Sequence, residues 1–259
     1  MNAEEMKNYK GVFVFAQQVD NKLSGISFEL IGEGKRLAEK LDEQVTAVLI
    51  GSDVKGLVDE LAEYGADRVI VVDDPELKEY RTEPYAHALA SVINEYKPEI
   101  VLVGATAIGR DLGPTVSARV ATGLTADCTQ LDIGDFPLVP TPGKEQKHNQ
   151  LLMTRPAFGG NIMAQIVISE SRPQFATVRY KVMDRAGKVE KPSGKVTICN
   201  VSEDMVRSRI EVLSAKVLEH VRSIEEEDVL VVAGRGAGKA LDQLQELTEL
   251  LGGHLCFTR

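Results

Sequence analysis

Tryptophan is absent from the 259 residues, cysteine occurs three times, and no apolar run approaches the length of a membrane-spanning helix. Cys128, Cys199 and Cys256 lie far apart and form no metal-binding spacing, and their odd number argues against a disulfide framework. The N-terminal segment carries two glutamates and no apolar core, unlike a secretory signal or a basic transit peptide. We therefore expect a cytoplasmic, reducing location, no membrane insertion and no metal site.

The sequence also lacks the residue sets that side-chain catalysis requires. Its four histidines share no spacing with acids or cysteines, and it contains neither a Walker motif nor a nucleophile elbow. The net charge of −9 argues against a nucleic-acid-binding surface. We therefore predict no catalytic side chain, which leaves binding, or redox chemistry by a held cofactor, as the function.

Apolar runs alternate with amphipathic stretches through the first hundred residues. The predicted strands are 11–16, 45–50, 68–72 and 100–103, and the predicted helices are 24–41, 54–64 and 83–96. Thr82 fits the N-cap of the last of these helices. A further helix should open at Arg110 and Asp111, which fit either a ligand contact or a plain helix-start ion pair. The alternation predicts a Rossmann-like α/β fold, a parallel sheet with helices on both faces.

The pattern changes after residue 124, where short strand-like runs follow one another between turn residues. These runs are 128–133, 151–154, 161–168, 174–179 and 196–201. They predict an antiparallel extension of the parallel sheet. The polar stretch 181–195 fits a hairpin or a crossover loop.

The string VLVVAGRGAGK, residues 229–239, predicts a strand that ends in a glycine-rich turn. Leucines at helical spacing follow, and a second strand begins near Leu255, so the order is that of half a nucleotide-binding unit. Glycine lets a backbone approach phosphate oxygens, and Arg235 offers a bidentate phosphate contact. The pattern is not the dinucleotide fingerprint, so a plain βα turn fits equally well. We expect a domain over 1–204, a linker over 205–228 and a second domain over 229–259.

The string MTRPAFGGN, residues 153–161, is the most unusual local motif. Arg155 precedes a proline and is biased toward extended backbone, and Gly159 and Gly160 permit a close approach to the chain. An arginine, an aromatic ring and two glycines suit contact with a flat ring or a phosphate. The alternative is a hairpin corner with Phe158 packed in the core.

Three strings together resemble one family, the alpha subunit of electron transfer flavoprotein: GATAIGRDLGPTVSARVATGLTADCT, TRPAFGGNIMAQI and VLVVAGRGAGK. The resemblance implies a heterodimer with a beta subunit, on which the N-terminal Rossmann-like domain packs. It implies a second, doubly wound domain that binds FAD and carries electrons from a dehydrogenase, such as acyl-CoA dehydrogenase, to an acceptor. Some members hold a second FAD in the beta subunit and bifurcate electrons from NADH, with ferredoxin or flavodoxin as an acceptor.

The resemblance also implies cofactor-binding residues. Arg155 matches an arginine beside the flavin of the beta subunit. Arg235, between Gly234 and Gly236, matches an arginine that contacts FAD, and Thr258-Arg259 matches a serine-arginine pair at the flavin. A cation there would stabilise the negative charge of a reduced flavin.

Family members continue past Arg259, so the resemblance implies a FAD-binding domain truncated at its C-terminal side. Two other functions remain open at this point. One is a scaffold domain that only supports the beta subunit. The other is a small nucleotide-binding domain of the universal-stress type.

Overall fold

The computed structural model describes residues 1, 3–137, 146–192, 194–215, 224 and 227–258. It divides into two compact units, Met1–Glu211 and Val212–Arg259, which are described separately. The predicted linker, 205–228, spans this division, and its bounds stay a prediction because 216–223 and 225–226 lie outside the described residues. None of the helices in the described part of the chain is both long and apolar enough to cross a lipid bilayer.

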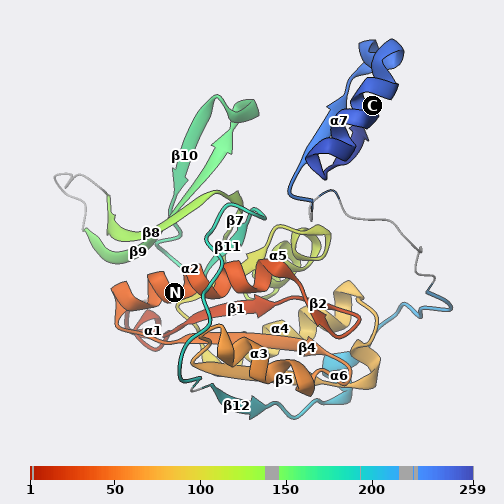
Figure 1. The fold of residues 1–259 in the computed structure, drawn as a ribbon. Helices are drawn as coiled ribbons and strands as arrows, with labels where there is room; N and C mark the ends of the chain where they lie inside the picture. The colour runs from red at the N-terminus through yellow and green to blue at the C-terminus, as the bar shows by residue number, and fades with distance from the viewer. Residues whose placement is uncertain (2, 138–145, 193, 216–223, 225–226, 259) are drawn as a thin grey trace. The chain divides into compact units, whose positions relative to one another are not determined.

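The first unit is built on a sheet of seven strands that all pair in parallel (Figure 1). Its order is β12-β5-β4-β1-β6-β11-β7. The strands are β1 Val12–Ala16, β4 Val45–Gly51, β5 Arg68–Asp73, β6 Ile100–Gly104, β7 Leu124–Cys128, β11 Gln174–Val178 and β12 Lys195–Ile198. The predicted Rossmann-like parallel sheet is confirmed.

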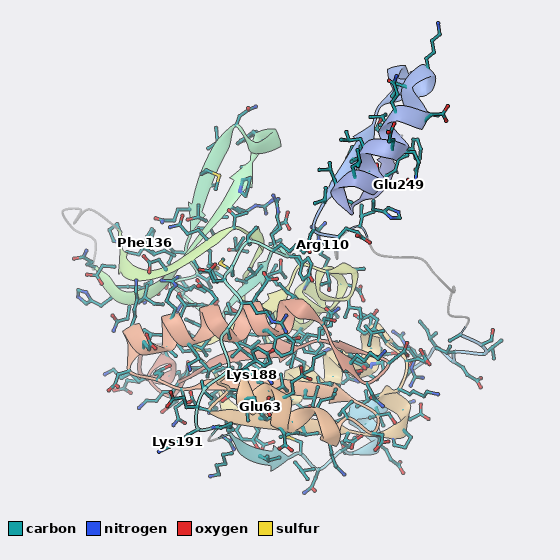
Figure 2. All side chains as sticks on the ribbon, in the orientation of Figure 1. Glu63, Arg110, Phe136, Lys188, Lys191 and Glu249 are labelled. Carbon is teal, nitrogen blue, oxygen red and sulfur yellow. The ribbon has the colours of Figure 1, made fainter. Side chains whose placement is uncertain are left out.

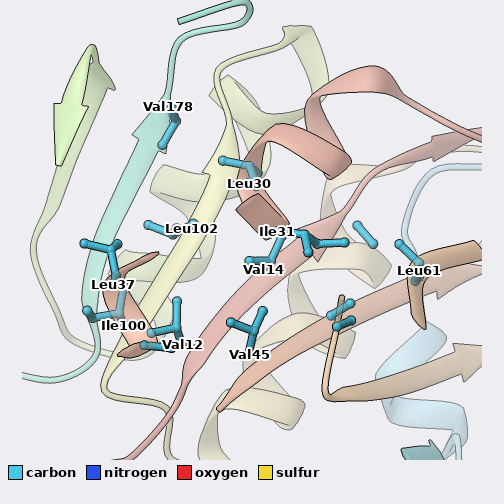
Figure 3. Close-up of a cluster of buried hydrophobic side chains, with 14 of the residues drawn as sticks. Val12, Val14, Leu30, Ile31, Leu37, Val45, Leu61, Ile100, Leu102 and Val178 are labelled. Carbon is cyan, nitrogen blue, oxygen red and sulfur yellow. The ribbon is translucent and has the colours of Figure 1, made fainter. Parts of the chain in front are cut away.

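Helices cover both faces of this sheet, because its central strands are apolar on both sides. Successive strand residues point to opposite faces, so Val12 and Val14 join one buried cluster while Phe13 and Phe15 join another. Figure 3 shows the first cluster, in which Leu30 of α2 and Leu61 of α3 lie among strand residues. The helices are α1 Ala3–Met6, α2 Gly25–Leu41, α3 Val58–Glu63, α4 Thr82–Tyr96, α5 Ala107–Arg119 and α6 Glu203–Val206.

The antiparallel part of the fold is a separate sheet of three strands, in the order β10-β9-β8. Its members are β8 Gln130–Phe136, β9 Lys147–Ala157 and β10 Ile162–Ile166, with a 3-10 turn at Phe158–Gly160. An antiparallel extension was expected, but two runs assigned to it, 174–179 and 196–201, belong to the parallel sheet as β11 and β12. Strand β11 is buried along its whole length between β6 and β7, a parallel-strand environment that a short apolar run does not reveal.

The chain passes from β11 to β12 by a long crossover, as one reading of 181–195 predicted. It crosses α2 and α3: the amide of Val189 donates to the carbonyl of Glu63 at 2.8 Å, and Lys188 pairs with the Glu63 carboxylate at 2.6 Å (Figure 2). A side chain at Gly32 of α2 would lie 2.8 Å from the Asp184 carbonyl oxygen, so glycine permits this close passage. The crossover thereby carries the chain from one half of the sheet to its far edge.

The second unit has the predicted order of strand, glycine turn, helix and strand. Strands β13 and β14 pair in parallel. The elements are β13 Leu230–Ala233, a 3-10 turn at Arg235–Ala240, α7 Leu241–Leu251 and β14 His254–Phe257. A short hairpin of β2 Gln18–Val19 and β3 Lys22–Leu23 follows β1 in the first unit.

Candidate functional site

The glycine turn of the second unit lies at the carboxyl edge of β13 and β14. Ala233 and Phe257, the last residues of the two strands, are paired, so both strands end side by side. The amide of Thr258 donates to the carbonyl of Ala233 at 3.0 Å. The structure therefore brings Gly234 and the turn after it to the same sheet edge as Thr258, whereas Arg259 lies outside the described residues.

The backbone of this turn is open. A Cβ atom added at Gly234, Gly236 or Gly238 would have no heavy atom within 4 Å, and Arg235 is exposed. Open glycine backbone followed by a helix, with a guanidinium group in the turn, fits the diphosphate of a dinucleotide such as FAD. The turn thus offers glycine backbone and one guanidinium group to an anionic ligand.

Arg155 lies in β9, opposite Ala164 of β10, and is partly buried. Strand β8 pairs with β9 only as far as Thr154. Beyond that point β9, the 3-10 turn and β10 form a two-stranded ribbon over residues 155–164, which we call the arm (Figure 1). Arg155 therefore lies at the base of the arm.

The hairpin corner predicted at the arm's tip is present, but Phe158 is not packed in a core. Its side chain is 81% exposed, and its backbone has a φ of 49°. Gly159 and Gly160 also have positive φ angles, which turn the chain away from the sheet. Ile162 and Met163 add exposed apolar surface beside Phe158, because no described element of the first unit covers the tip.

Arg110 and Asp111 do not form the helix-start ion pair that was one of the two expectations. Helix α5 begins at Ala107, and Arg110 pairs with Asp127 at 3.0 Å. Asp111 instead accepts hydrogen bonds from the hydroxyls of Tyr80 at 2.6 Å and Thr82 at 2.5 Å. The prediction that Thr82 is an N-cap is therefore wrong. Thr82 is the first residue of α4, and its hydroxyl donates to Asp111 of α5.

The crevice where the strand order reverses, between β1 and β6, is the usual ligand position in a doubly wound sheet. Here the Thr106 hydroxyl donates to the Gln17 side chain at 2.6 Å, and Gln18 reaches the Ile50 carbonyl at 3.2 Å. A cavity of about 130 Å³ remains beside Phe15 and Ile108. Ligand pockets commonly enclose about 300–1,000 Å³, so this crevice gives no support to the universal-stress type of nucleotide binding.

Comparisons with known proteins match most of this chain. Residues 12–205 match the model of the electron transfer flavoprotein domain. The chain is 44% identical to the protein FixB of Clostridium saccharobutylicum, over 97% of this chain and 72% of that protein. It is also 44% identical to the electron transfer flavoprotein subunit alpha of Thermoanaerobacterium thermosaccharolyticum, over 96% of this chain and 72% of that subunit.

A third relative is named as subunit LctC of a lactate dehydrogenase (NAD(+),ferredoxin) from Acetobacterium woodii. It is 40% identical over 97% of this chain and 58% of that subunit. The family model covers the first two of the three strings that carried the resemblance, and the glycine turn lies beyond its last matched residue. The matches to the three relatives cover 96–97% of this chain. The chain therefore belongs to the electron transfer flavoprotein family, among its alpha subunits.

Proposed function

We propose that the chain is an electron carrier that binds FAD in its second unit and a beta subunit through its first. The observation that carries this proposal is the shared carboxyl edge of β13 and β14, where an open glycine turn adjoins Thr258. FAD, when bound, supplies the redox chemistry. The chain's own residues hold the cofactor and position it between protein partners.

The residues at this sheet edge have separate roles in the proposal. The backbone at Gly234 and Gly236 approaches the diphosphate, because neither position has a side chain in the way. The guanidinium of Arg235 supplies two parallel hydrogen bonds to an anionic oxygen pair. The Thr258 hydroxyl acts at the adjoining strand end, beside the flavin, and the guanidinium of Arg259 supplies a positive charge that favours the reduced ring.

A comparison of two cations in the same turn tests this site. Arg235→Gln and Lys239→Gln each remove one positive charge from an exposed position of one 3-10 turn. Arg235→Gln loses a bidentate contact to the diphosphate, whereas Lys239→Gln loses only a nearby charge. The arginine variant should therefore bind FAD about tenfold more weakly than the lysine variant. The measurement is a titration of the alpha–beta complex with FAD, followed by flavin fluorescence. Equal losses of FAD affinity in the two variants would show that Arg235 contributes only its charge, and would refute the bidentate contact.

The arm supports the proposal that a beta subunit docks on the first unit. A two-stranded ribbon is marginally stable alone, and exposed apolar side chains such as Phe158 and Met163 mark a surface that a partner covers. Arg155 at the base of the arm then brings its charge to the flavin held by that partner. A positive charge there favours the reduced, more negative flavin.

We further propose that the electrons come from a dehydrogenase, such as acyl-CoA dehydrogenase, and that NADH-dependent bifurcation with ferredoxin or flavodoxin is one mode of use. The name of the Acetobacterium woodii relative, which includes NAD(+) and ferredoxin, supports that mode. The substitution Arg155→Gln tests the role of Arg155 in this mode. Loss of the positive charge should lower the reduction potential of the flavin held by the partner. An unchanged potential in the reassembled complex would speak against the assignment.

A further inference from the structure

A bulge at the end of β7 places Asp127 in an unusual position. Thr125 of β7 pairs with Ala176 of β11, and Cys128 pairs with Val178, so two residues of β7 face the single residue Thr177. Bulges of this kind bend a strand and redirect a side chain, often beside a functional site.

Asp127 itself has a left-handed backbone with a φ of 65°. Its amide is held by the Thr177 hydroxyl oxygen at 2.9 Å. A left-handed residue other than glycine costs conformational energy and persists where its surroundings fix it, often at binding sites.

Asp127 holds two arginines from different elements. The guanidinium of Arg110, at the start of α5, lies 3.0 Å from one carboxylate oxygen, and that of Arg179, just after β11, lies 2.7 Å from the other. Arg110 is also fixed by a hydrogen bond from its Nε to the carbonyl of Ala105 at 2.9 Å. One carboxylate thus positions two guanidinium groups at the carboxyl edge of the sheet, near the point labelled Arg110 in Figure 2.

The resulting cluster has an excess of positive charge. Arg155, at the base of the arm, lies near this bulge, because the amide of Thr129 donates to the carbonyl of Thr154 at 2.9 Å. Arg155 also lowers the pKa of the Asp127 carboxyl, after Arg179 and Arg110. Among the described residues of the first unit, Asp127 is the only carboxylate that pairs with Arg110 or Arg179. Three guanidinium groups and one carboxylate leave a net charge of about +2 at neutral pH, in a chain whose net charge is −9.

We propose that Arg110 and Arg179, oriented by Asp127, form with the neighbouring Arg155 a binding site for a phosphate-bearing ligand of the diphosphate class. Guanidinium groups match phosphate oxygens in pairs. The side chains of Arg110 and Arg179 are 61% and 44% exposed, so each keeps N–H groups available to a ligand while the carboxylate fixes its position. Arg155 is shared with the proposed function, whereas Arg110 and Arg179 take the site beyond it, and the site needs no flavin in the second unit.

The same diphosphate chemistry has two possible sources. A dinucleotide held by a partner subunit would present its diphosphate to the cluster when the two chains associate. A free phosphorylated metabolite would bind the cluster directly. In both cases Asp127 is a positioning residue, and the three arginines contact the ligand.

Calorimetric titration of the chain with sodium pyrophosphate, at constant ionic strength, tests the site. The double variant Arg110→Gln/Arg179→Gln should bind pyrophosphate at least tenfold more weakly than the wild type. Arg119→Gln is the matched control, because Arg119 is an exposed arginine at the opposite end of α5. It should leave the affinity unchanged, and circular dichroism should show the same unfolding midpoint for all three proteins.

The proposal is overturned if the wild type shows no saturable binding, or if Arg119→Gln weakens binding as much as the double variant does. It is also overturned if pyrophosphate does not bind while the double variant loses affinity for the beta subunit, since the arginines would then pair with carboxylates of that partner. The titration of the chain alone requires neither FAD nor a partner, so its failure would leave the proposed function standing.

Repeating the titration on the alpha–beta complex separates the two sources. Loss of pyrophosphate binding in the complex supports a site filled by a dinucleotide of the partner. Retained binding supports a free phosphorylated ligand.

Discussion

The carboxyl of Asp127 has a pKa below its ordinary value, first because Arg179 donates a hydrogen bond to it and then because Arg110 and Arg155 are near. A lowered pKa in the folded state means that ionised Asp127 stabilises the fold above the pKa of the unfolded chain, near 3.8. This stabilisation is lost as the pH falls through the folded-state pKa.

We therefore predict that Asp127→Asn lowers the free energy of unfolding by about 1–3 kcal/mol at pH 7, the usual contribution of hydrogen bonds to charged groups. The difference from wild type should shrink as the pH falls below about 4, where the carboxyl protonates in the unfolded chain, and should vanish below the folded-state pKa. Urea denaturation at several pH values measures it. Asp20→Asn is the control, because Asp20 is exposed and shares the left-handed backbone with a φ of 50°. A difference that stays constant down to pH 3 would contradict the linkage.

Gly109 allows α5 to pack closely against the end of β6. A Cβ at this residue would lie 1.8 Å from the carbonyl oxygen of Gly104, so the first turn of the helix rests directly on the end of β6. We predict that Gly109→Ala destabilises the protein by about 1–3 kcal/mol, because the helix must move away.

Gly56→Ala is the matched control for this substitution. A Cβ at Gly56 meets no atom within 4 Å, so this variant should be neutral or slightly more stable. Thermal unfolding of both variants provides the measurement. Equal stability of the two would show that α5 does not depend on close contact at Gly109.

The arm is the element whose surface most needs a partner. Phe158→Ser should weaken association with a beta subunit at least tenfold, because an exposed aromatic at a ribbon tip becomes buried on binding. Val19→Ser, at a 51% exposed valine of the β2–β3 hairpin, is the control and should have little effect. Surface-immobilised binding measurements compare the two variants. Similar losses of affinity in both variants would indicate nonspecific hydrophobic association and not docking by the arm.

The strands show which elements a single sequence predicts and which it does not. Strands β1, β4, β5 and β6 follow from apolar runs separated by amphipathic helices, and the structure has them where they were expected. The assignment fails for β11 and β12, because their sheet neighbours are strands distant in sequence. Neither a five-residue strand such as β11 nor an edge strand such as β12 reveals in its own sequence which strand it will pair with.

The bulge of β7 is a further element that patterns do not reveal. Asp127 carries no motif of its own, and its importance comes from two residues facing Thr177 of the neighbouring strand. Arg155 and Arg235 were singled out because glycines and a proline surround them in sequence. Residues defined by local strings can be predicted, whereas those defined by strand pairing require the structure.

At the scale of the whole molecule, the two units offer different surfaces. The first has a parallel sheet with buried central strands, a crevice between β1 and β6 reduced to a cavity of about 130 Å³, and an arm with an apolar tip. The second presents an open glycine turn at a sheet edge. The family is shown by similarity along most of the chain, while FAD and the beta subunit are the proposals on which this account depends.

The most direct test is the FAD content of the complex purified after co-expression of this chain with a beta subunit, determined from its visible absorption spectrum. We predict a yellow complex that contains at least as much FAD as alpha chain. A stable complex that remains colourless after incubation with excess FAD would contradict it.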